Sequence, residues 1–83
     1  MLKLSFVCLD TETTGLDENA EIIEIGMVKV IDGQIADRYN QLIRPYSPIP
    51  ETITQLTSID DAMVADQPHW NGVEQAVLEV IGD

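Results

Sequence analysis

In this chain of 83 residues, 15 Asp and Glu residues against four Lys and Arg residues give a formal net charge of −11 at pH 7. This balance argues against binding of nucleic acid through its phosphates alone, because such binding relies on Lys and Arg to displace counterions. The hydrophobic fraction of 45% is ordinary for a globular protein and argues against a disordered chain.

The length is that of one small domain or of a piece of one. No stretch approaches the roughly 20 apolar residues that a membrane span needs, and the first apolar run ends at Asp10, too early for a secretory signal. The single cysteine, Cys8, has no partner for an internal disulfide and is expected in the core. We therefore expect a cytoplasmic location and no membrane association.

Three segments are predicted to form strands. Residues 4–10 carry the run Phe6-Val7-Cys8-Leu9, which is apolar on both faces and typical of a central strand with neighbours on both edges. Residues 21–31 and 34–43 are the next two strands, and Asp32-Gly33 between them favours a two-residue hairpin turn. The predicted sheet is an antiparallel meander.

Two short helices are predicted after this meander. The prolines between residues 45 and 50 end the sheet, and Pro50 is expected in the first turn of a helix that runs to residue 56. Ser58 and Asp61 have the spacing of a capping box, which predicts a second short helix over residues 59–64.

A longer amphipathic helix is predicted over residues 70–81. Its apolar residues follow the spacing i, i+3, i+4, i+7 and i+8, which places them in one stripe. They are Val73, Ala76, Val77, Val80 and Ile81. Gly82 is expected to end this helix.

The segment Asp10-Thr11-Glu12-Thr13-Thr14-Gly15-Leu16 directly follows the first apolar run. Residues two apart in a strand point to the same face, so the carboxylates of Asp10 and Glu12 are expected side by side at the carboxyl end of the strand. Mg²⁺ usually keeps waters and phosphate oxygens beside one or two protein carboxylates. The pattern therefore predicts that Asp10 and Glu12 are metal ligands suited to phosphodiester cleavage.

The same segment resembles the first motif of the DEDD (DnaQ-like) 3′–5′ exonucleases, which include proofreading subunits of replicative DNA polymerases. The resemblance covers Phe6 to Leu16, continues through Ile22-Ile23-Glu24-Ile25-Gly26-Met27-Val28, and is weaker from there to Asp83. It implies an α/β, RNase H-like fold in which residues 1–83 are the N-terminal portion of a single exonuclease domain. The expected architecture is a three-stranded antiparallel meander followed by helices. The family's later motifs, two further Asp residues and a His, are not found in this sequence.

The resemblance also implies a metal-dependent 3′–5′ exonuclease that hydrolyses phosphodiester bonds from the 3′ end of nucleic acid. Asp10 and Glu12 would be catalytic ligands of a two-metal Mg²⁺ or Mn²⁺ site in the complete domain. Thr13 would bind the terminal nucleotide through its backbone N–H, Leu16 would pack on the terminal base, and Thr57 would border the nucleotide pocket.

Substrates and partners follow from the same resemblance. Single-stranded or frayed 3′ ends of DNA are the expected substrates, with RNA as the alternative. The expected partners are DNA polymerase or helicase subunits. Because later motifs are missing, the 83 residues by themselves are expected to be inactive or very weak.

Two other interpretations remain open. Oxygen-bearing residues in Asp10-x-Glu12-x-Thr14-Gly15-x₅-Glu21 approximate an EF-hand calcium loop, although the flanking segments have strand rather than helix propensity. A non-catalytic exonuclease-like module that docks on a polymerase or helicase would also account for the missing motifs. His69 does not match the position of the family's histidine and is expected to pack or lie at the surface.

Overall fold

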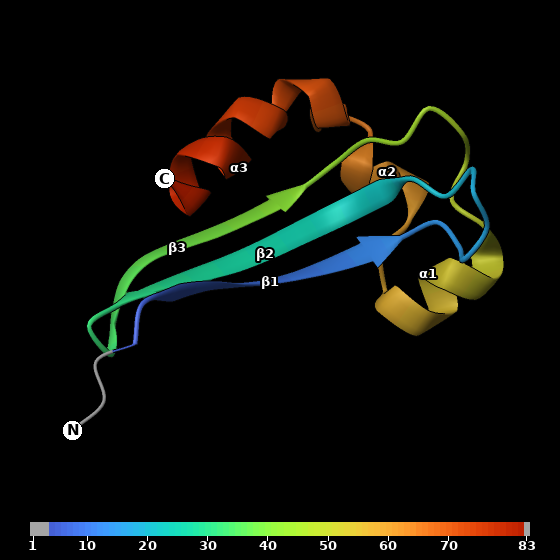
Figure 1. Ribbon diagram of the computed structural model, residues 1–83. Coiled ribbons are helices and arrows are strands. Elements are labelled where there is room, and N and C mark those ends of the chain that lie inside the picture. The colour runs from blue at the N-terminus through green and yellow to red at the C-terminus, as the bar shows by residue number, and fades with distance from the viewer. Residues whose placement is uncertain (1–3, 83) are drawn as a thin grey trace.

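The computed structural model describes residues 4–82 as one three-stranded sheet followed by short helices (Figure 1). The strands are β1 (Phe6–Thr13), β2 (Ile22–Ile31) and β3 (Gln34–Leu42). The helices are α1 (Glu51–Thr57), α2 (Asp61–Val64), the 3₁₀ turn η1 (Trp70–Gly72) and α3 (Glu74–Ile81). None of the helices in this described range is both long enough and apolar enough to cross a membrane.

The hairpin between β2 and β3 forms as the sequence predicts. Asp32 and Gly33 have positive φ angles of 52° and 81°, as the two central positions of a type I′ turn require. β2 pairs antiparallel with β1 on one edge and with β3 on the other. The predicted meander is therefore confirmed, and β2 is its central strand.

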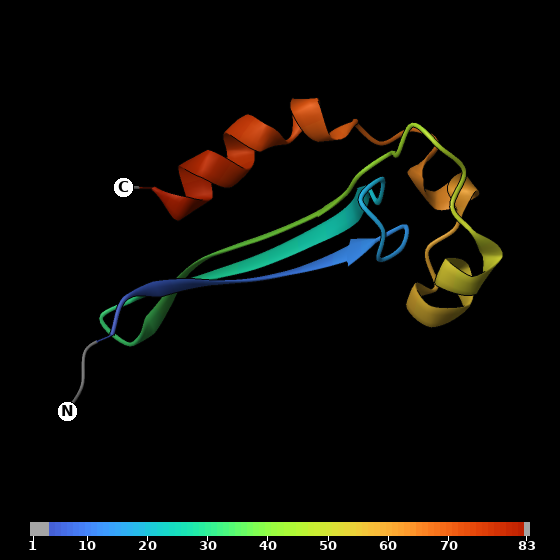
Figure 2. The same cartoon turned by 45° about the vertical axis from the view of Figure 1, so that its right-hand side comes forward.

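One face of the sheet is covered by α3 (Figures 1 and 2). Ile25 and Met27 of β2 point to this face and are each 2% exposed. They form a buried cluster with Val73, Val77 and Val80. Burial of one such aliphatic side chain contributes roughly 1.5–3 kcal/mol, so this cluster is the main attachment of α3 to the sheet.

The helix predicted over residues 70–81 differs at its start. Trp70–Gly72 forms a 3₁₀ turn and the α-helix begins only at Glu74, which agrees with the low helix propensity of glycine. Gly82 ends the helix as predicted, with its N–H donating to the carbonyl oxygen of Leu78 at 2.9 Å. The predicted stripe is buried at its valines.

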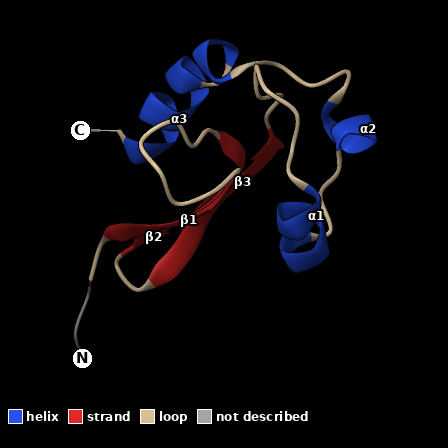
Figure 3. Cartoon of the chain, turned by 90° about the vertical axis from the view of Figure 1, so that its right-hand side faces the viewer, coloured by secondary structure: helices blue, strands red, loops and turns tan. Residues whose placement is uncertain are grey.

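A second buried cluster joins the end of the sheet to the segment that carries α1 and α2. Its buried members are Ile23, Ile49, Ile59 and Val64. Figure 3, which views the molecule from this end, shows α1 and α2 apart from α3. The cluster therefore holds α1 close to the carboxyl end of β1, where Figure 1 shows it.

The short helices begin differently from the prediction. Pro50 is the residue before α1 and not part of its first turn. The N-cap of α2 is Asp60, whose carboxylate accepts the N–H of Met63 at 2.9 Å, so the predicted capping box at Ser58 is wrong. Ser58 ends α1 in a left-handed conformation with φ of 66°, whereas an N-cap residue needs an extended backbone.

Within the described residues, β1 is an edge strand that pairs with β2 alone, although its sequence predicts neighbours on both edges. Phe6 and Leu9 are 50% and 53% exposed. Cys8 is exposed as well, so its predicted core position is wrong here. The side chain of Cys8 is exposed because it points to the sheet face opposite α3, which no described element covers (Figure 2).

Candidate functional site

The predicted metal ligands, Asp10 and Glu12, both lie within β1, near its carboxyl end. The strand extends past its predicted end at residue 10 to Thr13, because β2 continues to pair with it over this stretch. Positions two apart in one strand place both carboxylates on one face, as expected. Asp10 is exposed and Glu12 is half-buried.

Both carboxylates point to the sheet face that α3 leaves open. In the register of β1 and β2, Asp10 is opposite Gly26 and Glu12 is opposite Glu24, and directly opposed residues share a face. The alternate residues of β2 pack against α3. A Cβ atom at Gly26 would lie only 3.3 Å from the amide nitrogen of Asn40, so glycine keeps the surface beside Asp10 uncrowded.

The chain leaves β1 through a turn that hydrogen bonds hold in place. The pairing with β2 is irregular between Glu12 and Thr13. Just beyond, the N–H of Thr14 donates to the carbonyl oxygen of Glu21 at 2.9 Å, and the N–H of Glu21 donates to the Thr14 hydroxyl at 2.9 Å. The Thr13 hydroxyl donates to the carbonyl oxygen of Gly15 at 2.8 Å. These bonds fix the segment that directly follows the carboxylates.

A cavity of about 300 Å³ lies between this turn and α1, beside Glu12. Its lining residues are Thr11, Glu12, Thr13, Gly15, Leu16, Ile53, Leu56 and Thr57. The structure therefore brings Thr13, Leu16 and Thr57 together around Glu12. Asp10 does not line this cavity. Its side chain projects from the open face of the sheet, two residues before Glu12.

Of the lining residues that sequence reasoning did not single out, Ile53 and Leu56 come from α1, outside the first motif. They are three positions apart on α1 and so lie on one side of the helix. This spacing could have indicated from the sequence that the two side chains share a surface. What the sequence could not supply is the docking of α1 against the turn after β1.

The hydroxyl of Thr57 is already used within its own segment. It donates to the carbonyl oxygen of Ile53 at 2.8 Å and accepts the N–H of Ile59 at 3.2 Å. These bonds stabilise the last turn of α1. The role of Thr57 in substrate binding stays a prediction, and contact through its methyl group is the form that leaves these bonds intact.

The donor set of Asp10 and Glu12 fits part of the coordination shell of a hard divalent cation. Such a cation prefers oxygen ligands, and Mg²⁺ fills about six positions, several of them with water or phosphate oxygens. Within residues 4–82, no group of three or more His, Cys, Asp or Glu residues is placed to hold a metal ion. Firm binding of two ions would need further ligands.

The EF-hand interpretation is wrong. An EF-hand loop joins two helices, whereas the segment from Asp10 to Glu21 joins β1 to β2. In addition, Asp10 and Glu12 belong to a paired strand, so the two carboxylates cannot wrap around an ion as successive residues of a calcium loop.

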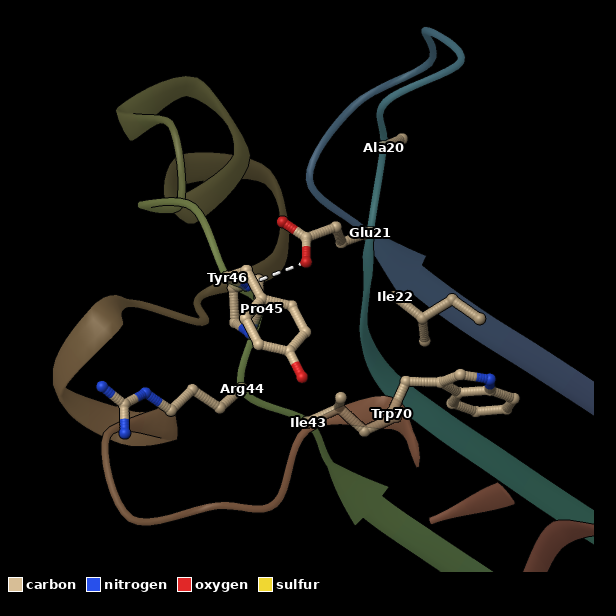
Figure 4. Close-up of a pocket in the computed structure, with 8 residues that line it drawn as sticks. All are labelled: Ala20, Glu21, Ile22, Ile43, Arg44, Pro45, Tyr46 and Trp70. Atoms are coloured by element: carbon tan, nitrogen blue, oxygen red, sulfur yellow. Dashed lines mark hydrogen bonds between the residues drawn. The ribbon is translucent and has the colours of Figure 1, made fainter. Parts of the chain in front are cut away.

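A different cavity, of about 260 Å³, lies beside the loop that follows β3 and has no lining residue from β1 (Figure 4). On its wall, the carboxylate of Glu21 accepts the N–H groups of Tyr46 at 2.8 Å and Ser47 at 3.2 Å. Tyr46 stacks on His69 with ring centroids 3.9 Å apart, and Nδ1 of His69 is 2.7 Å from the carbonyl oxygen of Arg44. His69 therefore has the packing role that the sequence predicts.

Comparison with known proteins assigns the family. The RNase T family model, described as Exonuclease, matches residues 7–83, a range that contains both carboxylates and the cavity beside Glu12. The chain therefore belongs to this exonuclease family, as its first motif indicates.

Two relatives of this chain are DNA polymerase III proteins by name. DNA polymerase III PolC-type of Caldanaerobacter subterraneus subsp. tengcongensis is 48% identical over 79 residues, which are 94% of this chain and 6% of that protein. DNA polymerase III subunit epsilon of Aquifex aeolicus is 39% identical over 84 residues, covering 100% of this chain and 42% of that protein. The chain thus spans less than half the length of these relatives.

Solved structures show the same fold. Exonuclease X, solved in complex with 5′ overhanging duplex DNA, matches with a TM-score of 0.75 and 37% identity over 94% of this chain and 44% of its own. The nuclease domain of 3′hExo, a DEDDh family member bound to rAMP, has a TM-score of 0.77 at 23% identity, over 90% of this chain and 42% of its own, and supports the fold alone. The predicted RNase H-like exonuclease fold, in its N-terminal part, is confirmed.

Proposed function

We propose that the complete protein is a metal-dependent 3′–5′ exonuclease that acts on unpaired 3′ ends, in which Asp10 and Glu12 are catalytic metal ligands. The observation that supports this most directly is their placement. Both carboxylates point to one open face, and Glu12 borders a cavity large enough to receive part of a nucleotide. This arrangement stands in a chain of the exonuclease family.

Asp10 and Glu12 would hold Mg²⁺ or Mn²⁺ with their carboxylate oxygens. When bound, such ions activate water and stabilise the leaving oxygen of a phosphodiester. The net charge of −11 argues against direct binding of phosphates. A cation held between the carboxylates and a phosphate would remove this repulsion locally, because it attracts both. The remaining ligands and a general base would come from outside residues 4–82.

The exposed edge of β1 supports such a completion. A strand that paired with this edge would cover Phe6 and Leu9 and bring its own side chains next to Asp10. The length of the relatives, which extends well beyond the matched segment, leaves room for it. Residues 1–83 would then be the N-terminal portion of a single exonuclease domain.

Within the cavity, the backbone N–H of Thr13 would meet the terminal nucleotide and Leu16 would contact its base. DNA is the proposed substrate and a DNA polymerase the proposed partner, because the similar proteins named above are DNA polymerase III chains. RNA is the alternative substrate, to be separated by assay.

The test is a 3′–5′ degradation assay on 5′-labelled single-stranded DNA and RNA, with the complete protein and Mg²⁺ or Mn²⁺. Asp10→Ala and Glu12→Ala are each expected to lower kcat by at least about 100-fold, and chelation should abolish the activity. Asp37→Ala, which removes an exposed carboxylate from β3, is the matched control and should leave it unchanged.

Two results would overturn the proposal. Degradation that survives Asp10→Ala would show that β1 does not carry the site. Absence of any nuclease activity in a folded complete protein, with either metal, would favour the non-catalytic docking module.

A further inference from the structure

We infer that Arg38 and Asn40 of β3 form a binding site for a backbone phosphate of the nucleic acid, separate from the metal ligands and on the 5′ side of the bond that is cleaved. The inference rests on the proposed function, because it takes the strand that reaches Asp10 as the ligand. Both side chains position the substrate by contact. Neither takes part in the metal or proton chemistry.

The register of the sheet places both side chains on the face that carries the two carboxylates of β1. Asn40 is opposite Gly26, which in turn is opposite Asp10, and directly opposed residues share a face. Arg38 is two positions before Asn40 in β3 and therefore points the same way. The amide nitrogen of Asn40 lies 3.3 Å from the position that a Cβ atom of Gly26 would take. The amide of Asn40 thus leans over the glycine that separates it from Asp10.

A cavity of about 300 Å³ opens beside these two side chains. Its lining residues are Gly26, Met27, Val28, Arg38, Tyr39 and Asn40. Arg38 and Asn40 are exposed, and both present side-chain N–H donors. Guanidinium and amide N–H groups are common contacts of phosphate oxygens in nucleic acid complexes. The chemistry of this cavity therefore favours an anionic ligand.

The distribution of charge selects Arg38 as the main contact. The described strands carry two cationic side chains, Lys29 and Arg38. Lys29 is opposite Val7, which packs against the buried cluster that α3 forms with the sheet, so Lys29 belongs to the covered face. Arg38 is opposite Val28 and lies on the open face. In a chain of net charge −11, this cation attracts a phosphate on a face where the carboxylates alone would repel it.

The spacing of the strands decides which phosphate this is. β1 and β3 are two strand spacings apart, roughly 10 Å, whereas the oxygens that bind Mg²⁺ lie roughly 2 Å from the ion. The side chains of β3 therefore contact a phosphate other than the one at the metal. With the terminal nucleotide beside Glu12, that phosphate belongs to the strand on the 5′ side of the scissile bond. Because phosphate contacts carry no sequence information, binding at this site should be independent of base sequence.

The experiment compares two substrates of the complete protein, a single-stranded DNA oligonucleotide and a dinucleoside monophosphate, which has only the scissile phosphate. For Arg38→Gln we expect KM for the oligonucleotide to rise about tenfold with kcat nearly unchanged, and both constants for the dinucleotide to keep their parental values. Asn40→Ala should show the same pattern with a rise of about threefold, and Arg38→Lys should keep most of the affinity. Lys29→Gln removes the same charge from the opposite face and is the matched control, which should leave KM unchanged.

The salt dependence of binding gives a second readout that does not require cleavage. Fluorescence anisotropy measures Kd for single-stranded DNA with the complete protein carrying Asp10→Ala, over a series of salt concentrations. Each phosphate neutralised on a single strand steepens the plot of log K against log salt concentration by about 0.7. Adding Arg38→Gln should make the slope shallower by about 0.7, and adding Lys29→Gln should leave it unchanged.

The outcomes separate this inference from the proposed function. If Arg38→Gln changes neither KM nor the salt slope while Asp10→Ala abolishes activity, the phosphate site is refuted and the nuclease stands. If Arg38→Gln raises KM equally for both substrates, Arg38 acts at the scissile phosphate and the inference is also refuted. Equal effects of Arg38→Gln and Lys29→Gln would refute it as well, because they would reflect net charge alone. A salt slope that responds to Arg38→Gln in a protein without nuclease activity would support the phosphate site and overturn the proposed function.

Discussion

The two outer strands of the sheet, β1 and β3, present opposite kinds of surface at their free edges. Along β3, the polar residues Asp37, Arg38 and Asn40 are exposed, and such side chains discourage pairing with another chain. Along β1, Phe6 and Leu9 are half exposed, and no polar residue precedes Asp10 in the strand. The β3 edge is therefore suited to solvent exposure, whereas the β1 edge is suited to packing against another protein segment.

The contrast between β1 and β3 indicates how the candidate site is built. The apolar part of β1 is the part that a further strand is expected to cover. The two carboxylates of β1 follow this part and point to the open face of the sheet. An exposed apolar edge is prone to pair with another strand, so its presence here supports the proposal that the complete protein adds a strand to this edge. Three measurements on the complete protein would test whether β1 and β3 differ in this way.

The largest effect is expected in amide hydrogen exchange. If β1 is paired on both edges in the complete protein, all its amides from Phe6 to Glu12 should exchange slowly, by several orders of magnitude relative to an open strand. In β3, alternate amides should exchange fast, because an antiparallel edge strand leaves every second N–H without a partner. An alternating pattern in β1 like that of β3 would show that its edge stays open, and the proposed completion would be wrong.

A smaller effect is expected from a matched pair of truncations. Phe6 of β1 and Ile35 of β3 are both opposite Val30, so they share the open face, and their exposures are 50% and 55%. If β1 is covered in the complete protein, Phe6→Ala should lower the free energy of unfolding by about 3 kcal/mol, and Ile35→Ala by less than about 1 kcal/mol. Urea denaturation measures both, and equal losses would remove the distinction between the two sides of the sheet.

The smallest effect is expected at the hairpin that attaches β3. Gly33 has φ of 81°, a conformation in which a Cβ atom costs roughly 1–2 kcal/mol. Gly33→Ala should therefore lower the free energy of unfolding by about 1 kcal/mol without changing KM, since the turn lies at the end of the sheet far from α1 (Figure 1), whose residues line the cavity. Gln34→Ala is the control, and a change in KM for Gly33→Ala would mean that the hairpin influences the site.

The sequence predicted most where local chemistry decides the structure. The Asp32-Gly33 turn forms because both positions tolerate positive φ, and the meander follows from alternating and continuous apolar runs. The family was also identifiable from one continuous segment around Asp10. In contrast, the capping of α2 was missed, because Ser58 and Asp60 are both acceptable caps in sequence and only the end of α1 excludes Ser58.

At the candidate site, local periodicity is enough to place two carboxylates on one face, since Asp10 and Glu12 are two apart in a strand of period two. Which face of the sheet they occupy is set by tertiary contacts, because it depends on where α3 packs. The cavity likewise depends on the docking of α1, through the cluster around Ile23, against a turn distant in sequence. Short-range periodicity encodes the orientation of neighbouring side chains, whereas the placement of Leu16 and Leu56 on one cavity depends on the hydrophobic contacts that dock α1, which no local pattern specifies.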